Sequence, residues 1–182
     1  MTHTQALHHN FNLLARYNQW MNDKVYQLAA TLSQEQLFAN QGAFFGSVAG
    51  TLNHLLVADL IWLNRFRQLD TAAEVLQPLG QLPHPAALDQ ILYPDFVRLH
   101  SIRQQLDQLL IQLCQRLDDQ QLQRILSYKN LKGEMMKRKL APLLQHLFNH
   151  QTHHRGQVTT LFSQLGLDVG VTDLFVLIDN ED

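Results

Sequence analysis

The amino-acid sequence predicts an all-α protein, a four-helix bundle that carries one small β-hairpin before its last helix. Three observations lead to this fold class. Four long segments place apolar residues at the three- and four-residue spacing of one helix face. Strand-like sequence is confined to one short stretch, and serine, proline and glycine stand where helices begin and end. Antiparallel packing of four such amphipathic helices produces a bundle.

The composition is that of one globular domain, which we expect to span residues 1–182. Hydrophobic residues make up 46% of the chain and charged residues 16%, so the chain can bury a substantial core. A net charge of −2 offers no basic surface to nucleic acid or to an anionic membrane, and the apolar runs are too short to span a bilayer. The single cysteine, Cys114, and the lack of a signal-peptide pattern favour a cytoplasmic protein.

The first two helices are predicted from periodicity and from their capping residues. Apolar residues recur at helical spacing over about residues 11–30 and 48–69. Between them, Ser33 and Gln36 have the spacing of a capped turn. Ser47 stands where it can cap the second helix through its hydroxyl group.

A long connector separates the second helix from the third. Residues 71–85 contain three prolines and a glycine, and a connection of this length is unusual in a bundle. It therefore either crosses the bundle or covers a site. Pro94 suits the first turn of the third helix, which we expect to continue to about Leu117.

The pattern changes after the third helix. Two short segments, residues 125–128 and 134–137, flank Gly133 and predict a β-hairpin with this glycine in the turn. A fourth helix follows over residues 142–165. The apolar residues 174–178 are expected to pack on the bundle.

Histidines are concentrated on the predicted fourth helix. At about 100° per residue, His154 lies in the middle of the apolar face and His150 at its edge, whereas His146 is marginal and His153 points outward. His150 and His154 are four residues apart, a spacing at which two imidazoles reach one divalent ion. The alternative is a pair of buried histidines that hydrogen-bond to other polar groups.

Two histidines do not complete a metal site, and His54 is the best candidate for a third ligand. It is the histidine inside the predicted second helix, and its neighbours one turn away (Gly50, Thr51 and Ala58) are small. However, the main apolar stripe of that helix lies on a different side. Periodicity therefore leaves open whether His54 is a ligand or a partly exposed side chain.

Three segments resemble the motifs of the DinB (YfiT-like) family. They are residues 17–22, residues 46–56 followed by Asp59, Trp62 and Arg65, and residues 146–157. The resemblance runs in order over about residues 11–166. It implies an up-down-down-up bundle, a homodimer, and one divalent ion, usually zinc or nickel, held by His54, His150 and His154. Some members of this family are thiol-dependent transferases or isomerases that use low-molecular-weight thiols.

A site of three histidines leaves one coordination position open, which is typical of catalytic metal centres. The first hypothesis is therefore a metal-dependent enzyme, a transferase or hydrolase, with thiol transfer as its leading version. The alternative is a non-enzymatic bundle that the metal stabilises and that binds a small molecule or a partner. A third possibility is that the histidines are core residues and bind no metal.

The sequence identifies no general base, so the catalytic residues stay unassigned. By helical position Asp59 points away from His54, and a capping or buried hydrogen-bonding role is expected. A surface or interface salt bridge is expected for Arg155. The histidine rings need hydrogen-bond partners that orient them, and Asn53, Asn149 and Gln157 are all near enough in sequence to serve.

Overall fold

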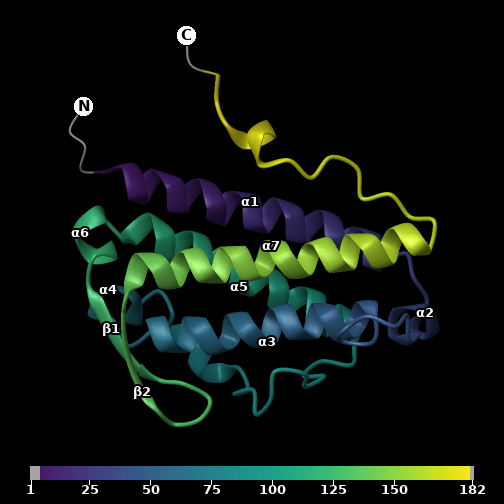
Figure 1. Cartoon of the computed structure of the whole chain (residues 1–182), viewed down its shortest axis with the longest axis horizontal. Coiled ribbons are helices and arrows are strands. Elements are labelled where there is room, and N and C mark those ends of the chain that lie inside the picture. Colours follow the sequence, from purple (N-terminus) through teal and green to yellow (C-terminus); the bar gives the residue numbers. More distant parts are fainter. Residues whose placement is uncertain (1–4, 181–182) are drawn as a thin grey trace.

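A computed structural model describes residues 5–180, and Figure 1 shows its ribbon. Long helices dominate the described part of the chain, which confirms the predicted fold class. In chain order the elements are α1 (Ala6–Ala29), α2 (Gln34–Phe38), α3 (Val48–Phe66), α4 (Asp70–Ala73), the 3-10 helix η2 (Gln77–Gln81), α5 (Phe96–Arg116), α6 (Asp119–Leu122), β1 (Ile125–Lys129), β2 (Met135–Lys139), α7 (Leu140–Gln164) and the 3-10 helix η3 (Leu174–Leu177).

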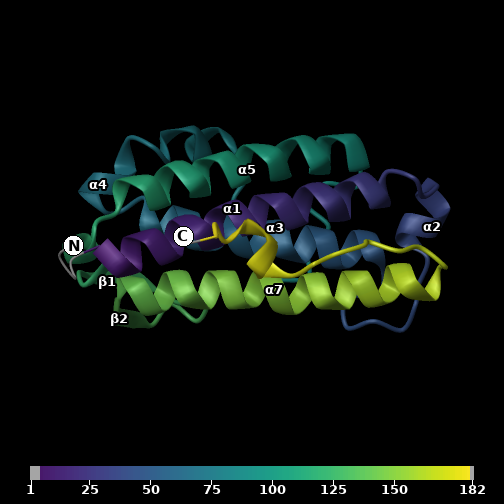
Figure 2. The same ribbon diagram turned by 90° about the horizontal axis from the view of Figure 1, so that it is seen from above.

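The four long helices α1, α3, α5 and α7 lie side by side along the long axis of the molecule (Figures 1 and 2). In Figure 1, α1 runs from left to right, α3 and α5 run back, and α7 follows the direction of α1. This is the up-down-down-up order. α1 packs against α5 and α7, and α3 also packs against both. Because α3 and α5 point the same way, the chain between them must return along the whole bundle.

The connector between α3 and α5 makes this return. It is more ordered than the sequence indicates, because it contains α4 and η2 and buries Leu76 and Leu79. Its far end is tied to the beginning of α3 through Asn53. The Tyr93 backbone N–H donates to Asn53 Oδ1 (2.9 Å), and Asn53 Nδ2 donates to the Tyr93 carbonyl (3.2 Å). The predicted crossing is therefore confirmed.

The capping predictions hold for two helices and fail for one. Ser33 and Gln36 form a complete capping box at α2, and Ser47 Oγ accepts the backbone N–H three residues further along in α3. Pro94, in contrast, lies outside α5. The carboxylate of Asp95 accepts two backbone N–H groups of the first turn, so Asp95 is the N-cap and the proline precedes it.

The predicted hairpin is present. Its second strand begins one residue later and ends two residues later than predicted. β1 pairs antiparallel with β2, and Gly133 adopts a φ of +81° in the turn, a value that favours glycine. Along β1 the side chains alternate, and Leu126 and Tyr128 are the two buried residues. The strand thus covers one end of the bundle with one face.

The C-terminal tail differs from the prediction. Residues 174–178 lie beside α1, but Phe175 remains 68% exposed and Ile178 55%. The four helices already fill the core, so this segment rests on the outer surface. Polar contacts hold the preceding residues instead, including a hydrogen bond from Tyr17 Oη to the Thr172 carbonyl (2.7 Å).

The most deeply buried helix is α3. Its apolar character on all sides is accounted for by α5, α7 and the connector, which together bury it from Val48 to Leu60 without interruption. In residues 5–180 we find no helix that combines the length and the hydropathy needed to cross a membrane.

Gly50 sits where the loop before α3 crosses closest to the helix. A Cβ at this position would lie 2.0 Å from the carbonyl oxygen of Phe45, so Gly50→Ala should force the loop away from α3. We expect the free energy of unfolding to fall by about 1–3 kcal/mol, the usual cost of overpacking. Chemical denaturation measures the change.

Gly156→Ala is the matched control, because Gly156 lies in α7 and a Cβ added to it would meet nothing within 4 Å. Alanine favours a helix over glycine by up to about 1 kcal/mol, so this variant should be as stable as the parent or more so. Equal effects in the two variants would contradict the proposed close contact at Gly50.

Candidate metal centre

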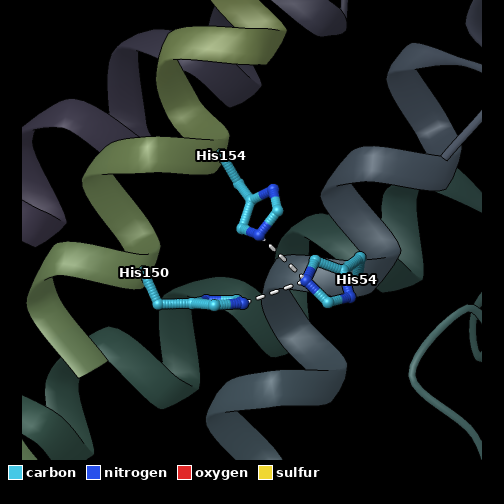
Figure 3. A group of neighbouring side chains, drawn as sticks. All are labelled: His54, His150 and His154. Atoms are coloured by element: carbon cyan, nitrogen blue, oxygen red, sulfur yellow. Dashed lines mark hydrogen bonds between the residues drawn. The ribbon is translucent and has the colours of Figure 1, made fainter. Parts of the chain in front are cut away.

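Three histidines from two helices converge on one point (Figure 3). His54 comes from α3, and His150 and His154 come from successive turns of α7. The Nε2 atom of His54 lies 3.0 Å from that of His150 and 3.2 Å from that of His154. The structure therefore brings together the three histidines proposed as ligands, and their ring nitrogens are close enough to share one ion.

Hydrogen bonds at the outer nitrogens determine which nitrogen faces the centre. His54 Nδ1 contacts the carbonyl oxygen of Leu88 (2.8 Å), and His154 Nδ1 contacts Gln157 Oε1 (2.8 Å). A carbonyl oxygen only accepts, so each Nδ1 carries the proton and each Nε2 presents a lone pair. Two lone pairs 3.2 Å apart repel each other unless a cation lies between them. This donor set therefore fits a metal ion.

Of the three side chains weighed as partners for the rings, the structure selects Gln157. Asn53 is engaged with the backbone of Tyr93, and Asn149 accepts a hydrogen bond from Gln145. The contact between His54 Nδ1 and the Leu88 carbonyl cannot be predicted from the sequence pattern, because any residue carries such a carbonyl and Leu88 is 34 residues from His54. The connector thus also covers the site, in addition to crossing the bundle.

Burial keeps the three imidazoles neutral. It lowers the pKa of His54 and of His154 below the ordinary value for histidine. Burial, together with the neighbouring histidines, lowers the pKa of His150 to about 3. Neutral imidazole is the form that binds a metal ion. The site is therefore ready to bind near neutral pH without first losing protons.

This state predicts an unusual pH dependence of metal affinity. Exposed histidines begin to lose a metal as the pH falls through their ordinary pKa of about 6.5. Because all three pKa values here are shifted down, we expect the affinity for Zn²⁺ to stay constant through that pH and to decline only in more acidic solution. Competition with a chromophoric chelator at a series of pH values measures this. A decline centred on about pH 6.5 would contradict it.

His54 is more deeply placed than periodicity indicates, at 4% exposure. The ring of Phe45 stacks on it with a centroid separation of 3.8 Å and an interplanar angle of 16°. Phe45 also meets the edge of His154. The sequence offers only a weak signal for this contact, namely an aromatic residue shortly before the Ser47 cap.

The other histidines within residues 5–180 lie outside the centre. His153 is exposed, as expected from its helical position, and His84 is exposed as well. His100 stacks against Tyr26 and Phe96, which fits a structural role. His146 lies one turn before His150 and lines the cleft beside it, with ring centroids 6.2 Å apart.

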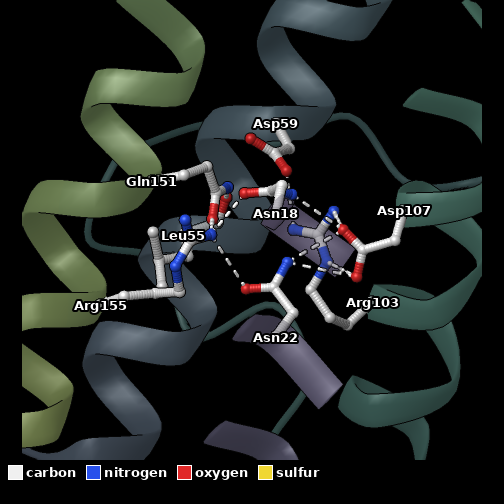
Figure 4. A network of polar contacts seen from close by, with 8 residues as sticks. All are labelled: Asn18, Asn22, Leu55, Asp59, Arg103, Asp107, Gln151 and Arg155. Carbon is white, nitrogen blue, oxygen red and sulfur yellow. Dashed lines mark hydrogen bonds and ion pairs between the residues drawn. The ribbon is translucent and has the colours of Figure 1, made fainter. Parts of the chain in front are cut away.

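A buried polar network joins all four long helices (Figure 4). Arg103 of α5 donates to Asp59 of α3 (2.7 Å) and forms an ion pair with Asp107 one turn further along α5. Asn18 and Asn22 of α1 donate to Asp107. The predicted buried role of Asp59 is therefore confirmed.

Arg155 of α7 completes the network, which corrects the prediction of a surface or interface salt bridge. It is 3% exposed and hydrogen-bonds to the side-chain oxygens of Asn18 and Asn22. These partners lie on α1, which packs against α7. Burial lowers its pKa to about 10. Arg155 follows His154 directly, so the network fixes the part of α7 that carries the ligands.

Comparison with known proteins agrees with this arrangement. The profile of the DinB family matches residues 2–181. The chain belongs to the DinB family. The Protein DinB of Bacillus subtilis (strain 168) is 26% identical over 165 residues, which cover 88% of each chain. No solved structure matches the chain significantly. Family membership and the three-histidine cluster together fit a metal-binding role.

Proposed function

We propose that this member of the DinB family is a metal-dependent enzyme, a transferase or hydrolase, in which His54, His150 and His154 hold one divalent ion. The observation that carries the proposal is the convergence of three Nε2 atoms, with the outer nitrogens of two of the rings held by Leu88 and Gln157. Three protein ligands are the usual set of a catalytic zinc site, whose fourth position takes water or substrate.

The spacing of the nitrogens supports a small divalent ion. Zinc–nitrogen bonds of about 2.0–2.1 Å at tetrahedral angles put neighbouring nitrogens about 3.3 Å apart. The observed separations from His54 Nε2 are 3.0 and 3.2 Å. Nitrogen ligands suit zinc, nickel and copper better than magnesium or calcium. Zinc or nickel is the ion we propose.

The surroundings supply room for a substrate. A cleft of about 300 Å³ is lined by His54 and His150 together with residues of α3 and the connector. A bound ion would supply Lewis acidity and lower the pKa of a coordinated water or thiol. The chain's own contribution is to hold the imidazoles neutral and oriented, through burial and through Leu88 and Gln157.

Among the described residues, no carboxylate joins the histidines as a general base. Asp59 turns toward Arg103 instead. This absence favours chemistry in which the metal activates the nucleophile. A thiol suits such chemistry because the pKa of a thiol lies closer to neutral pH than that of water. Thiol transfer, with a low-molecular-weight thiol as one substrate, is the version we propose first.

Ligand exchange on the metal separates this proposal from a non-enzymatic, metal-stabilised bundle. With Co²⁺ in place of the native ion, we expect the visible bands to shift on addition of azide, and 2-mercaptoethanol to add a sulfur-to-cobalt charge-transfer band. Bands that respond to neither ligand would mean a closed structural site. Turnover is then sought with thiols paired with electrophiles and with esters.

The homodimer stays a prediction from the family resemblance. Light scattering coupled to size-exclusion chromatography measures the mass in solution. A mass near twice the 21.0 kDa of the chain is the expected result, and a mass near 21.0 kDa would contradict it.

A further inference from the structure

One side of α3 points along a continuous cleft that begins at the histidine centre. His54, Ala58, Ile61 and Arg65 all line this cleft, and their spacing places them within a narrow sector of the helix. A second hollow of about 360 Å³ adjoins it, lined by the β-hairpin residues Tyr128 and Lys132. Trp62, Arg65 and Leu131 line both hollows, so Arg65 lies at the boundary between them.

Arg65 is the charged group at this junction. Its guanidinium lies over the ring of Trp62 (4.5 Å from the centroid) and over that of Tyr128 (4.7 Å). These contacts hold the guanidinium plane and leave its N–H edges free, the edges that bind carboxylate or phosphate in bidentate fashion. Partial burial lowers the pKa of Arg65.

Arg65 differs from the two fully buried arginines in having no partner. Arg103 pairs with two aspartates, and Arg155 is held by asparagine oxygens. For the guanidinium of Arg65, no hydrogen bond or ion pair is found within residues 5–180. The acid that lines the second hollow, Glu134, accepts a hydrogen bond from Asn130 (2.8 Å). A half-buried cation without an anion is costly unless a ligand supplies one.

We propose that Arg65 recognises the anionic group, a carboxylate or a phosphate, of an elongated ligand whose reactive end lies at the three histidines. The proposal depends on the proposed function only in placing the reactive end of the ligand at the histidines. His54 and Arg65 are 11 residues apart, so their backbone positions are separated by about 16 Å along α3. Ala58, Ile61 and Leu88 make the wall between them apolar. The ligand therefore has an acidic head and an apolar middle.

Fluorescence of the metal-free protein tests the anion site without the metal. Trp20→Phe leaves Trp62, which contacts Arg65, as the single reporter. Hexanoate and hexyl phosphate are titrated against neutral hexanamide. We expect at least one anion to bind about tenfold or more tightly than hexanamide, a difference of about 1.4 kcal/mol. The tighter of the two anions identifies the head group.

Variants of Arg65 decide whether this residue is responsible. Arg65→Gln should abolish the preference for the anion, and Arg65→Lys should keep part of it because the charge remains without the planar fork. Arg98→Gln, an exposed position on α5, should leave it unchanged. Circular dichroism checks that each variant is folded. Equal binding of hexanoate, hexyl phosphate and hexanamide to the folded parent would overturn the proposal, as would an anion preference that survives in Arg65→Gln.

The span to the metal is tested with 6-mercaptohexanoate and 6-mercaptohexanamide on the Co²⁺ protein. We expect the charge-transfer band to form at concentrations about tenfold or more lower for the acid, and the advantage to vanish in Arg65→Gln. Equal affinities would overturn the proposed span while leaving the metal centre intact. No thiolate band with either compound, together with anion binding by the metal-free protein, would instead overturn the proposed function and leave the anion site standing.

Discussion

His150→Ala is expected to abolish stoichiometric metal binding, from about one ion per chain to none. His150 Nε2 is one of three nitrogens at the centre, and its partner His54 Nε2 lies 3.0 Å away. Removing a side chain that only hydrogen-bonds to a metal ligand already lowers metal affinity by about 10–100-fold. Removing a ligand itself should lower the affinity by more than that. His54→Ala should behave in the same way.

Metal content by inductively coupled plasma mass spectrometry on untagged protein measures this result. His146→Ala is the matched control, because His146 is exposed on the same helix, one turn from His150, and lies outside the cluster. It should retain about one ion per chain. Metal lost equally from all three variants would contradict the ligand set, and no metal in the parent even after reconstitution would return the histidines to the role of core residues.

The same variants should differ from the parent in thermal stability. A ligand at about 100 times its Kd stabilises the folded state by about 2.7 kcal/mol, which raises Tm by about 5–11 °C for a chain of this size. A chelator should therefore lower the Tm of the parent and of His146→Ala by that amount. It should leave His54→Ala and His150→Ala unchanged.

Arg103→Ala is expected to be the most destabilising substitution outside the centre. Arg103 is 1% exposed and lies between the carboxylates of Asp59 and Asp107, which are each 1% exposed. Its removal leaves both carboxylates buried without a cation, a change that costs about 3–5 kcal/mol. For a chain of this length we expect Tm to fall by roughly 6–20 °C.

Arg116→Ala is the matched control, because Arg116 also pairs with an acid outside its own helix but is 51% exposed, beside Glu74 at 79%. An exposed pair contributes about 0–1 kcal/mol. Thermal and urea unfolding of both variants measures the difference. Similar losses of stability in Arg103→Ala and Arg116→Ala would show that burial in the low-dielectric interior does not strengthen the Arg103 ion pairs.

The destabilisation by Arg103→Ala should also depend on pH. Burial already raises the pKa of Asp107 to about 6, although Arg103 opposes the shift. Without Arg103 the pKa of Asp107 rises further. A carboxyl group whose pKa is raised in the folded state destabilises that state as the pH increases. The free energy of unfolding of the variant should therefore be closest to that of the parent below about pH 4, where the carboxyl group is protonated in both the folded and the unfolded state. The difference should be largest near neutral pH and above. A loss that is constant over this range would argue against buried charge as its cause.

Local sequence signals are sufficient for most of the secondary structure. The Ser33 and Ser47 caps, the hairpin with Gly133 in its turn and the C-terminal end of α7 all follow from contacts within a few residues. The error at α5 has the same local origin. A proline suits the first turn of a helix, but the carboxylate of Asp95, next to Pro94, supplies the stronger cap.

For the site, the spacing of His150 and His154 on one helix is enough to propose a pair of ligands. His54 is 96 residues from His150, and no periodicity relates positions on two helices. Its assignment needs the resemblance to the DinB family. The burial of Arg155 is likewise beyond the sequence pattern, because its partners Asn18 and Asn22 lie on α1, and the helical wheel of α7 carries no information about them.

Taken alone, the chain's order of apolar and capping residues specifies four helices, a hairpin and one histidine pair, because these depend on neighbours in sequence. The packing of α3 against α7 and the connector supplies the rest: the third histidine, the Leu88 carbonyl that sets its tautomer, and the cleft that joins the centre to Arg65. Each of these requires groups from separate elements to meet within contact distance. Such meetings follow from how the helices pack and not from the spacing of residues along any one of them.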